Sequence, residues 1–229
     1  MTTVTEYTYT DEQISAWLRG LLTIAWADGN FDGHEQELIT SLTRDQLAPK
    51  TDLGSLQTIT PQELATALGE DSAIRENFLR TAVMMSIADG IYTQEEAAIV
   101  NHFREALGLE IEALKCLEHT LCDYTEEGEE KVKVIKPVAP TQPSGDVLKP
   151  MRDWLDGIEV EDPRVARFVC KMIPAQCPFE RDVKLFGHKI VHIPPMCKIN
   201  PLYEQLVGLR FRSLSYLADD CQEDISQYV

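Results

Sequence analysis

The stretch IAWADGNFDGHEQELI, residues 24–39, aligns without a gap with MSIADGIYTQEEAAIV, residues 85–100. Both copies contain Ala-Asp-Gly followed two positions later by an aromatic residue. An apolar run precedes each glycine, and apolar residues recur at helical spacing after it. The repeat therefore predicts two equivalent helix pairs, with Gly29 and Gly90 ending the first helix of each pair in a left-handed conformation.

Helix-start signals follow each glycine and recur along the chain. Asp32-x-x-Glu35 and Thr93-x-x-Glu96 have the pattern of capping boxes, in which the first and fourth residues satisfy each other's backbone N–H groups. Similar signals and apolar periodicity predict further helices at 60–68, with Pro61 in its first position, and at 110–122, 162–173 and 202–219.

The predicted fold class is all-α: a duplicated helical bundle followed by a small, mainly helical, loop-rich C-terminal domain. Residues 124–146 combine a charge run with three prolines, which favours an extended, flexible linker. The domains are therefore predicted at 10–123 and 147–229. Within the second, residues 184–193 are expected to form a short hairpin around Gly187.

Charge divides the chain in the same way. Residues 1–130 carry 25 acidic and 7 basic side chains, whereas residues 131–229 carry 13 and 14. Such a negative field repels nucleic acid and anionic lipid and attracts cations or basic proteins. Basic residues gather between 164 and 198, so we expect the two domains to dock on each other or to bind a partner that competes for one of these surfaces.

The composition also limits the cellular setting. No window is apolar and long enough for a membrane span, and the acidic N-terminus lacks the basic start of a secretory signal. Six cysteines in such a chain favour a reducing compartment, and hence a cytoplasmic protein.

The first repeat contains a candidate cation loop. Asp28-Gly29-Asn30-Phe31-Asp32-Gly33 matches the opening of an oxygen-ligand loop for calcium or magnesium, but Ile39 stands at the twelfth position, where a carboxylate is needed. The alternative is that these acids cap helices and remain solvated. The candidate positions for a cation or a docked partner are Asp28, Asn30, Asp32, Glu35, Glu37, Asp89 and Glu96.

The paired Ala-Asp-Gly signature with its downstream glutamate resembles the tellurite-resistance TerB-like family. That resemblance implies a helical bundle with an acidic surface, a link to stress responses, divalent-metal binding and no catalysis.

Residues 147–229 carry the motifs IPAQCPFERDVK, HIPPMCKINPLYEQLVGLRFRSL and YLADDCQED. These closely resemble the family known as Mo-dependent nitrogenase C-terminus. The resemblance implies a cyanobacterial, cytoplasmic protein and brings no mechanism with it.

The second domain also contains a candidate zinc or iron–sulfur site. No C-x2-C pair is present, but thiols and imidazoles lie close in sequence in a proline-rich region that a metal would stabilise. The alternative is that Cys170 and Cys221 are small core residues. The candidate ligands are Cys170, Cys177, His188, His192, Cys197 and Cys221.

The helix predicted at 202–219 has a clear apolar stripe. Tyr203, Val207, Phe211, Leu214, Leu217 and Cys221 recur every three or four residues and are expected to be buried. Glu204, Gln205, Arg210 and Arg212 are then expected to face outward.

None of the common nucleotide-binding or hydrolase motifs is present. We therefore expect a non-catalytic interaction or regulatory protein, a stress-related adaptor with an acidic docking domain. The alternative is a metal-binding or thiol redox sensor that uses the C-terminal Cys/His cluster.

Overall fold

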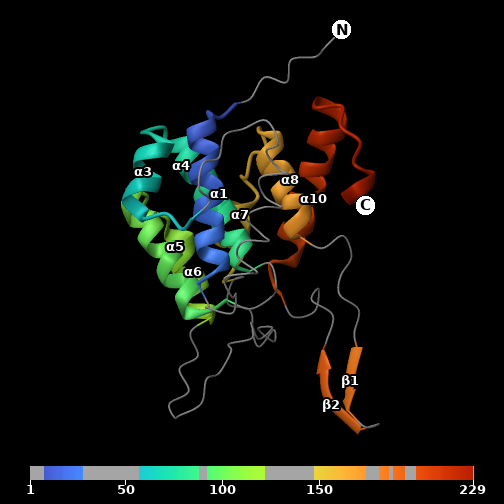
Figure 1. The fold of residues 1–229 in the computed structure, drawn as a ribbon. Coiled ribbons are helices and arrows are strands. Elements are labelled where there is room, and N and C mark those ends of the chain that lie inside the picture. The colour runs from blue at the N-terminus through green and yellow to red at the C-terminus, as the bar shows by residue number, and fades with distance from the viewer. Residues whose placement is uncertain are drawn as a thin grey trace.

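The computed structural model describes residues 8–27, 57–87, 92–121, 147–173, 181–185, 188–193 and 200–228. The fold is all-α, as predicted, apart from one two-stranded hairpin (Figure 1). The helices of the first half are α1 (Asp11–Ala25), α3 (Pro61–Leu68), α4 (Ser72–Ser86), α5 (Gln94–Ala106) and α6 (Glu112–Leu121). The second half contributes α7 (Lys149–Leu155), α8 (Pro163–Met172), α10 (Tyr203–Ser215), a π-helical turn η2 (Tyr216–Asp220) and a 3-10 turn η3 (Ser226–Tyr228).

Helices α1 and α4 reproduce the internal repeat. Each has 15 residues, and both their starts, Asp11 and Ser72, and their ends, Ala25 and Ser86, are 61 positions apart, the offset of the sequence repeat. The equivalent residues Trp17 and Phe78 contact each other edge to face in the core, with ring centroids 5.5 Å apart. The first half is therefore built around two equivalent helices that pack through equivalent positions.

The observed helix starts agree with the predicted ones more closely than the observed helix ends do. Thr60 and Thr93 both form complete capping boxes, and Pro61 occupies the first turn of α3, as predicted. The predicted glycine ends are wrong: α1 ends at Ala25 and α4 at Ser86, before Gly29 and Gly90, which lie outside the described residues. The capping residues Trp26 and Ile87 have negative φ angles, so neither helix needs a glycine where it ends.

One apolar core includes residues of both halves. Trp17, Phe78 and Phe103 belong to the same buried cluster as residues of α7, α8 and α10, among them Met151 and Leu206. Figure 1 shows α8 beside α1 and α10 beside α8, with α7 next to α4 and α6. The boundaries predicted at 123 and 147 remain predictions, because residues 122–146 lie outside the described residues.

Polar contacts join α4 to the segment that follows α7. Asn77 is buried; its Nδ2 donates to the carbonyl oxygen of Glu159 at 2.7 Å, and its Oδ1 accepts from the Glu159 amide at 3.0 Å. One turn further along α4, Arg80 donates to the Gly157 carbonyl at 3.1 Å and lies over the Trp154 ring. The contact between the halves therefore combines apolar packing with hydrogen bonds, some of them from the buried side chain of Asn77.

The predicted hairpin is present. Strands β1 (Arg181–Leu185) and β2 (His188–Ile193) pair antiparallel, and Leu185 is opposite His188. In Figure 1 the hairpin lies to one side of the helices. Among the described helices, none has the length and apolar composition needed to span a membrane.

Candidate functional site

Most of the predicted cation positions cannot be placed. Asp28, Asn30, Asp32, Glu35, Glu37 and Asp89 lie outside the described residues. Glu96 is described, and its carboxylate accepts from the Thr93 amide and hydroxyl, both at 2.9 Å. Glu96 therefore has the capping role that was the alternative to cation binding. Whether the first repeat binds calcium or magnesium stays a prediction.

The predicted zinc or iron–sulfur ligands are described only in part. Cys177 and Cys197 lie outside the described residues, and for His188 and His192 only the backbone, in β2, is described. Within the described parts of the chain, no group of three or more His, Cys, Asp or Glu side chains could hold a metal ion. The six-residue site is therefore untested.

Cys170 lies in a small apolar cluster with Ala166, Leu217 and Tyr228. It is 4% exposed, and burial raises the pKa of its thiol to about 11. The thiolate, which binds metal and attacks oxidants, is therefore disfavoured at neutral pH. Cys170 is a small core residue, the alternative that the sequence left open.

Cys221 follows the π-helical turn η2 and is partly exposed, so its predicted place on a buried stripe is wrong. Burial raises the pKa of its thiol as well, while a hydrogen bond with Tyr216 acts in the opposite direction.

The described arginines of the first half bind main-chain carbonyl groups. Arg19 donates to the carbonyls of Gln57 and Thr58, at 3.0 and 3.1 Å. Arg75 donates from Nε to Gly69 and from Nη1 to Leu107, at 2.5 and 2.9 Å. Arg80 and Arg104 make similar contacts, to Gly157 and Leu109. Their guanidinium groups therefore hold turns together.

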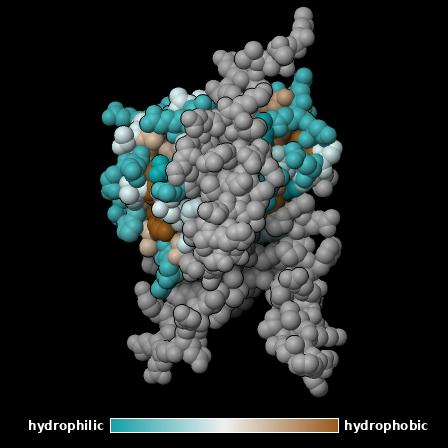
Figure 2. All heavy atoms as spheres, viewed as in Figure 1, coloured by the Kyte–Doolittle hydropathy of each residue, from teal (hydrophilic) through white to brown (hydrophobic). Residues whose placement is uncertain are grey.

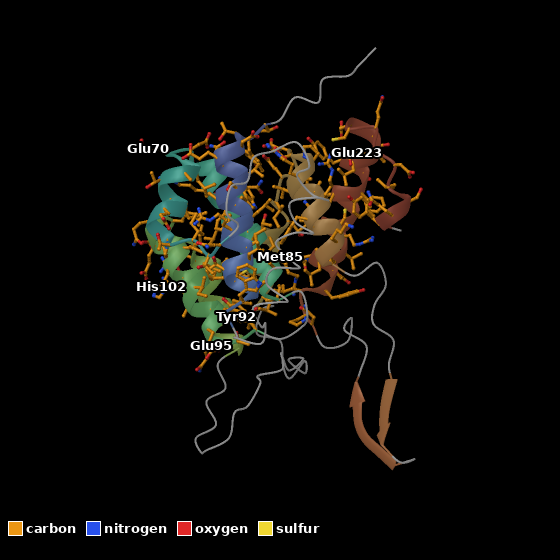
Figure 3. The ribbon with its side chains drawn as sticks, viewed as in Figure 1. Glu70, Met85, Tyr92, Glu95, His102 and Glu223 are labelled. Atoms are coloured by element: carbon orange, nitrogen blue, oxygen red, sulfur yellow. The ribbon has the colours of Figure 1, made fainter. Side chains whose placement is uncertain are left out.

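Several of the described acidic side chains of the same half are exposed. Arg75 joins the carbonyl of Gly69 to that of Leu107, and the exposed residues Glu70, Asp71 and Glu105 lie within two positions of these carbonyls in the sequence. We call these three residues the acidic edge. Figure 3 shows Glu70 and Glu95 at opposite ends of the outer side of the first half, and Figure 2 shows mainly hydrophilic residues over that side.

A hollow of about 260 Å³ lies between α5 and α6. Its lining includes two bases, Arg104 and Lys115, and two acids, Glu110 and Glu112. The mixed charge gives this hollow no preference for a cationic or an anionic ligand.

The buried side of α10 differs from the prediction. Leu202, Gln205, Leu206, Leu209 and Ser213 are buried. Val207 and Phe211, which were predicted to be buried, are 44% and 68% exposed. The helix therefore carries two apolar stripes, and the one facing the core is not the one with the larger side chains.

Two residues that were expected to face outward do not: Gln205 is buried and Arg210 is partly buried. Arg210 was expected outside but is partly buried, and it donates to the carbonyls of Ile173 and Tyr228. Arg212 donates to the Asp156 carbonyl at 2.8 Å. Both arginines therefore tie α10 to other segments of the second half.

A buried ion cluster was missed at the sequence level. Arg164, which we expected on a basic surface, is 1% exposed and donates to Asp162 Oδ2, Asp11 Oδ1 and the Tyr9 carbonyl. Burial alone would lower the pKa of Arg164, but hydrogen bonds and charges from Asp162 and Asp11 raise it. The spacing Asp162-Pro163-Arg164 was the available signal, because the capping carboxylate also reaches the arginine.

Comparison with protein families gives one informative result. Residues 147–229 match the family described as Mo-dependent nitrogenase C-terminus, in agreement with the resemblance of the sequence motifs. Comparison with curated proteins and with solved structures gave no match. The TerB-like resemblance of the first half stays a prediction.

Proposed function

We propose that this chain is a non-catalytic adaptor that binds a basic partner protein through the acidic edge of its first half. The observation that carries this proposal is that the basic and acidic side chains of the first half differ in their contacts. Four described arginines of the first half donate to carbonyl groups, and two of them, Arg80 and Arg104, also pair with carboxylates. Glu70, Asp71 and Glu105 are exposed, and Glu105 is paired with its neighbour Arg104 at the surface. The described arginines of this half are therefore used mainly within the chain, whereas its exposed carboxylates present negative charge that a basic partner can meet.

The stress-related role and the TerB-like relationship belong to the same proposal. An acidic surface on a duplicated helical bundle is what that resemblance implies, and the 61-residue offset between α1 and α4 supports the duplication. A cytoplasmic location fits an adaptor in which Cys170 and Cys221 are free thiols.

The proposal can be tested with a synthetic lysine-rich peptide and the full chain. Fluorescence anisotropy should show binding at low salt that weakens as salt screens the charges. The E70Q/E105Q variant should bind roughly three- to tenfold more weakly, since an exposed ion pair contributes up to about 1 kcal/mol. Asp71 is kept because it caps α4.

The D219N/D220N variant is the matched control, because it removes two exposed charges from the second half. An equal loss of affinity in both variants would mean that net charge alone attracts the peptide. No binding by the wild-type chain at low salt would also contradict the proposal.

The alternative proposal, a metal or thiol redox sensor, has less support. The raised pKa of Cys170 disfavours the thiolate that such a sensor needs. Elemental analysis of anaerobically purified chain tests it directly: stoichiometric zinc or iron would favour the sensor over the adaptor.

A further inference from the structure

The exposed stripe of α10 is a feature that the proposed function does not use. Phe211 is 68% exposed and Val207 is 44% exposed, one helical turn apart on the same side of the helix. Gly208 lies beside them, and a Cβ atom added there would meet nothing within 4 Å. A glycine inside a helix costs about 0.5–1 kcal/mol relative to alanine, and no close packing among the described residues explains this one.

Two charged residues flank Gly208 symmetrically. Glu204 precedes it by four positions and Arg212 follows it by four. Within the described residues, Glu204 has no ion-pair partner, and Arg212 contacts the Asp156 carbonyl but no carboxylate. Among the described residues, one acid and one base therefore lack an oppositely charged partner, four positions on either side of Gly208, which is partly buried but has open space where a Cβ would stand.

We propose that this face of α10 binds α10 of a second copy of the chain, antiparallel, across a twofold axis at Gly208. In such a pair, each residue four positions before the glycine faces the residue four positions after it. Glu204 of each copy is then level with Arg212 of the other, and two symmetric ion pairs form. A twofold interface requires this self-complementary arrangement.

The apolar residues fit the same geometry. With a rise of about 1.5 Å per residue, Phe211 lies about 4.5 Å from the axis along one helix, and Val207 of the other copy lies about 1.5 Å from it on the same side. Each Phe211 therefore packs against Val207 of the other copy. Gly208 permits the close approach that this contact needs.

Charge opposes the association of two copies through their first halves but not through this face. Residues 1–130 carry 25 acids and 7 bases, so the first halves of two copies repel each other, whereas residues 131–229 are nearly neutral. One helix face is smaller than the roughly 800 Å² per partner of a standard interface, so the dimer is weak and forms with increasing concentration.

Sedimentation velocity of the full chain, across a roughly hundredfold range of concentration, tests the proposal. We expect a monomer–dimer equilibrium, and F211S should weaken it at least roughly tenfold because it removes a buried aromatic contact from each copy. G208A should also weaken the dimer while leaving the monomer as stable or more stable, so its effect cannot come from misfolding.

The charge pairs have their own test. E204R alone should weaken the dimer, and the E204R/R212E exchange should restore part of the lost affinity, because the two ion pairs reform with opposite polarity. A chain that stays monomeric at all concentrations overturns the proposal and assigns the face to a different partner. A dimer that tolerates both F211S and G208A overturns it as well.

Discussion

Arg164 Nη1 donates to Asp11 Oδ1 at 2.7 Å, a contact that joins residues 153 positions apart. The two sides of this pair differ in environment, because the Arg164 side chain is 1% exposed and that of Asp11 is 59% exposed. The second carboxylate on Arg164, that of Asp162, is completely buried and also caps α8. Arg164 therefore neutralises a buried charge and holds the start of α1 against α8.

Replacement of Arg164 should be strongly destabilising. R164M leaves Asp162 buried without its counter-charge, so we expect a loss of about 3–5 kcal/mol of unfolding free energy. D11N removes an exposed partner and should cost less than about 1 kcal/mol. Urea unfolding followed by circular dichroism compares the two, and similar losses in both variants would argue against the buried-charge account.

The stability of the chain should fall at alkaline pH through Tyr9. Burial raises its pKa from 10.0 to about 12, and a hydrogen bond from Asn77 acts in the opposite direction. A raised pKa in the folded state means that stability is full below pH 10 and is lost as the pH rises towards 12. Each tenfold difference in the acid dissociation constant of Tyr9 between the folded and unfolded states corresponds to about 1.4 kcal/mol of unfolding free energy.

Y9F removes this titration. Its unfolding free energy at neutral pH should be lower, because the contact with Asn77 is lost, but its slope between pH 10 and 12 should be shallower than in the wild type. Identical slopes in the two proteins would show that Tyr9 ionises as freely in the folded chain as in the unfolded one.

Substitution of Asn200 should be destabilising, because both the donor and the acceptor of its side-chain amide are in use. Asn200 is buried, its Nδ2 donates to the Ile87 carbonyl at 2.8 Å, and its Oδ1 accepts from the Leu202 amide at 2.9 Å. N200A should cost about 1–3 kcal/mol, because buried partners are left unsatisfied.

N200D is the informative comparison for this site. It keeps the acceptor for Leu202 but places a carboxylate against the Ile87 carbonyl. The melting temperature of N200D should therefore be at least as far below that of the wild type as the melting temperature of N200A. A wild-type melting temperature in N200D would contradict a stabilising contact between Asn200 and the end of α4.

Gly20 should not tolerate a side chain. A Cβ atom there would lie 2.8 and 2.9 Å from two ring atoms of Phe78, which is completely buried. G20A should therefore cost about 1–3 kcal/mol through overpacking, even though alanine favours helix. Unfolding of G20A and of the double variant G20A/F78L provides the check, since the smaller residue should relieve part of the loss.

The fold was predictable where one local signal was enough. Thr60-Pro61 and Thr93-x-x-Glu96 fix helix starts through contacts within four residues, and both capping boxes are present. Helix α7 was missed, although Lys149-Pro150 marks its start and Met151 and Leu155 lie one turn apart. Its burial depends on α4 and α6, which are distant in sequence.

The sites were less predictable because burial is a tertiary property. On α10, two stripes have equally good helical spacing, so periodicity does not show which of them is buried. The prediction chose the stripe with the larger side chains, which includes Val207 and Phe211, and the structure leaves these two residues exposed. Arg164 and Arg210 looked like surface charges, yet their long side chains reach buried carbonyls and carboxylates. A sequence pattern cannot show such partners when they lie in another segment.

The long separation between Arg164 and its partners at Tyr9 and Asp11 has a consequence during synthesis. About 140 residues separate the end of α1 from the start of α8, and at translation rates of about 5–20 residues per second α8 follows α1 by roughly 7 to 30 s. During that interval the nascent chain lacks the Arg164 guanidinium, which donates to the Tyr9 carbonyl and the Asp11 carboxylate in the folded chain. Closure of such a distant contact also slows folding, so the start of α1 reaches its final place late, when the second half has been made.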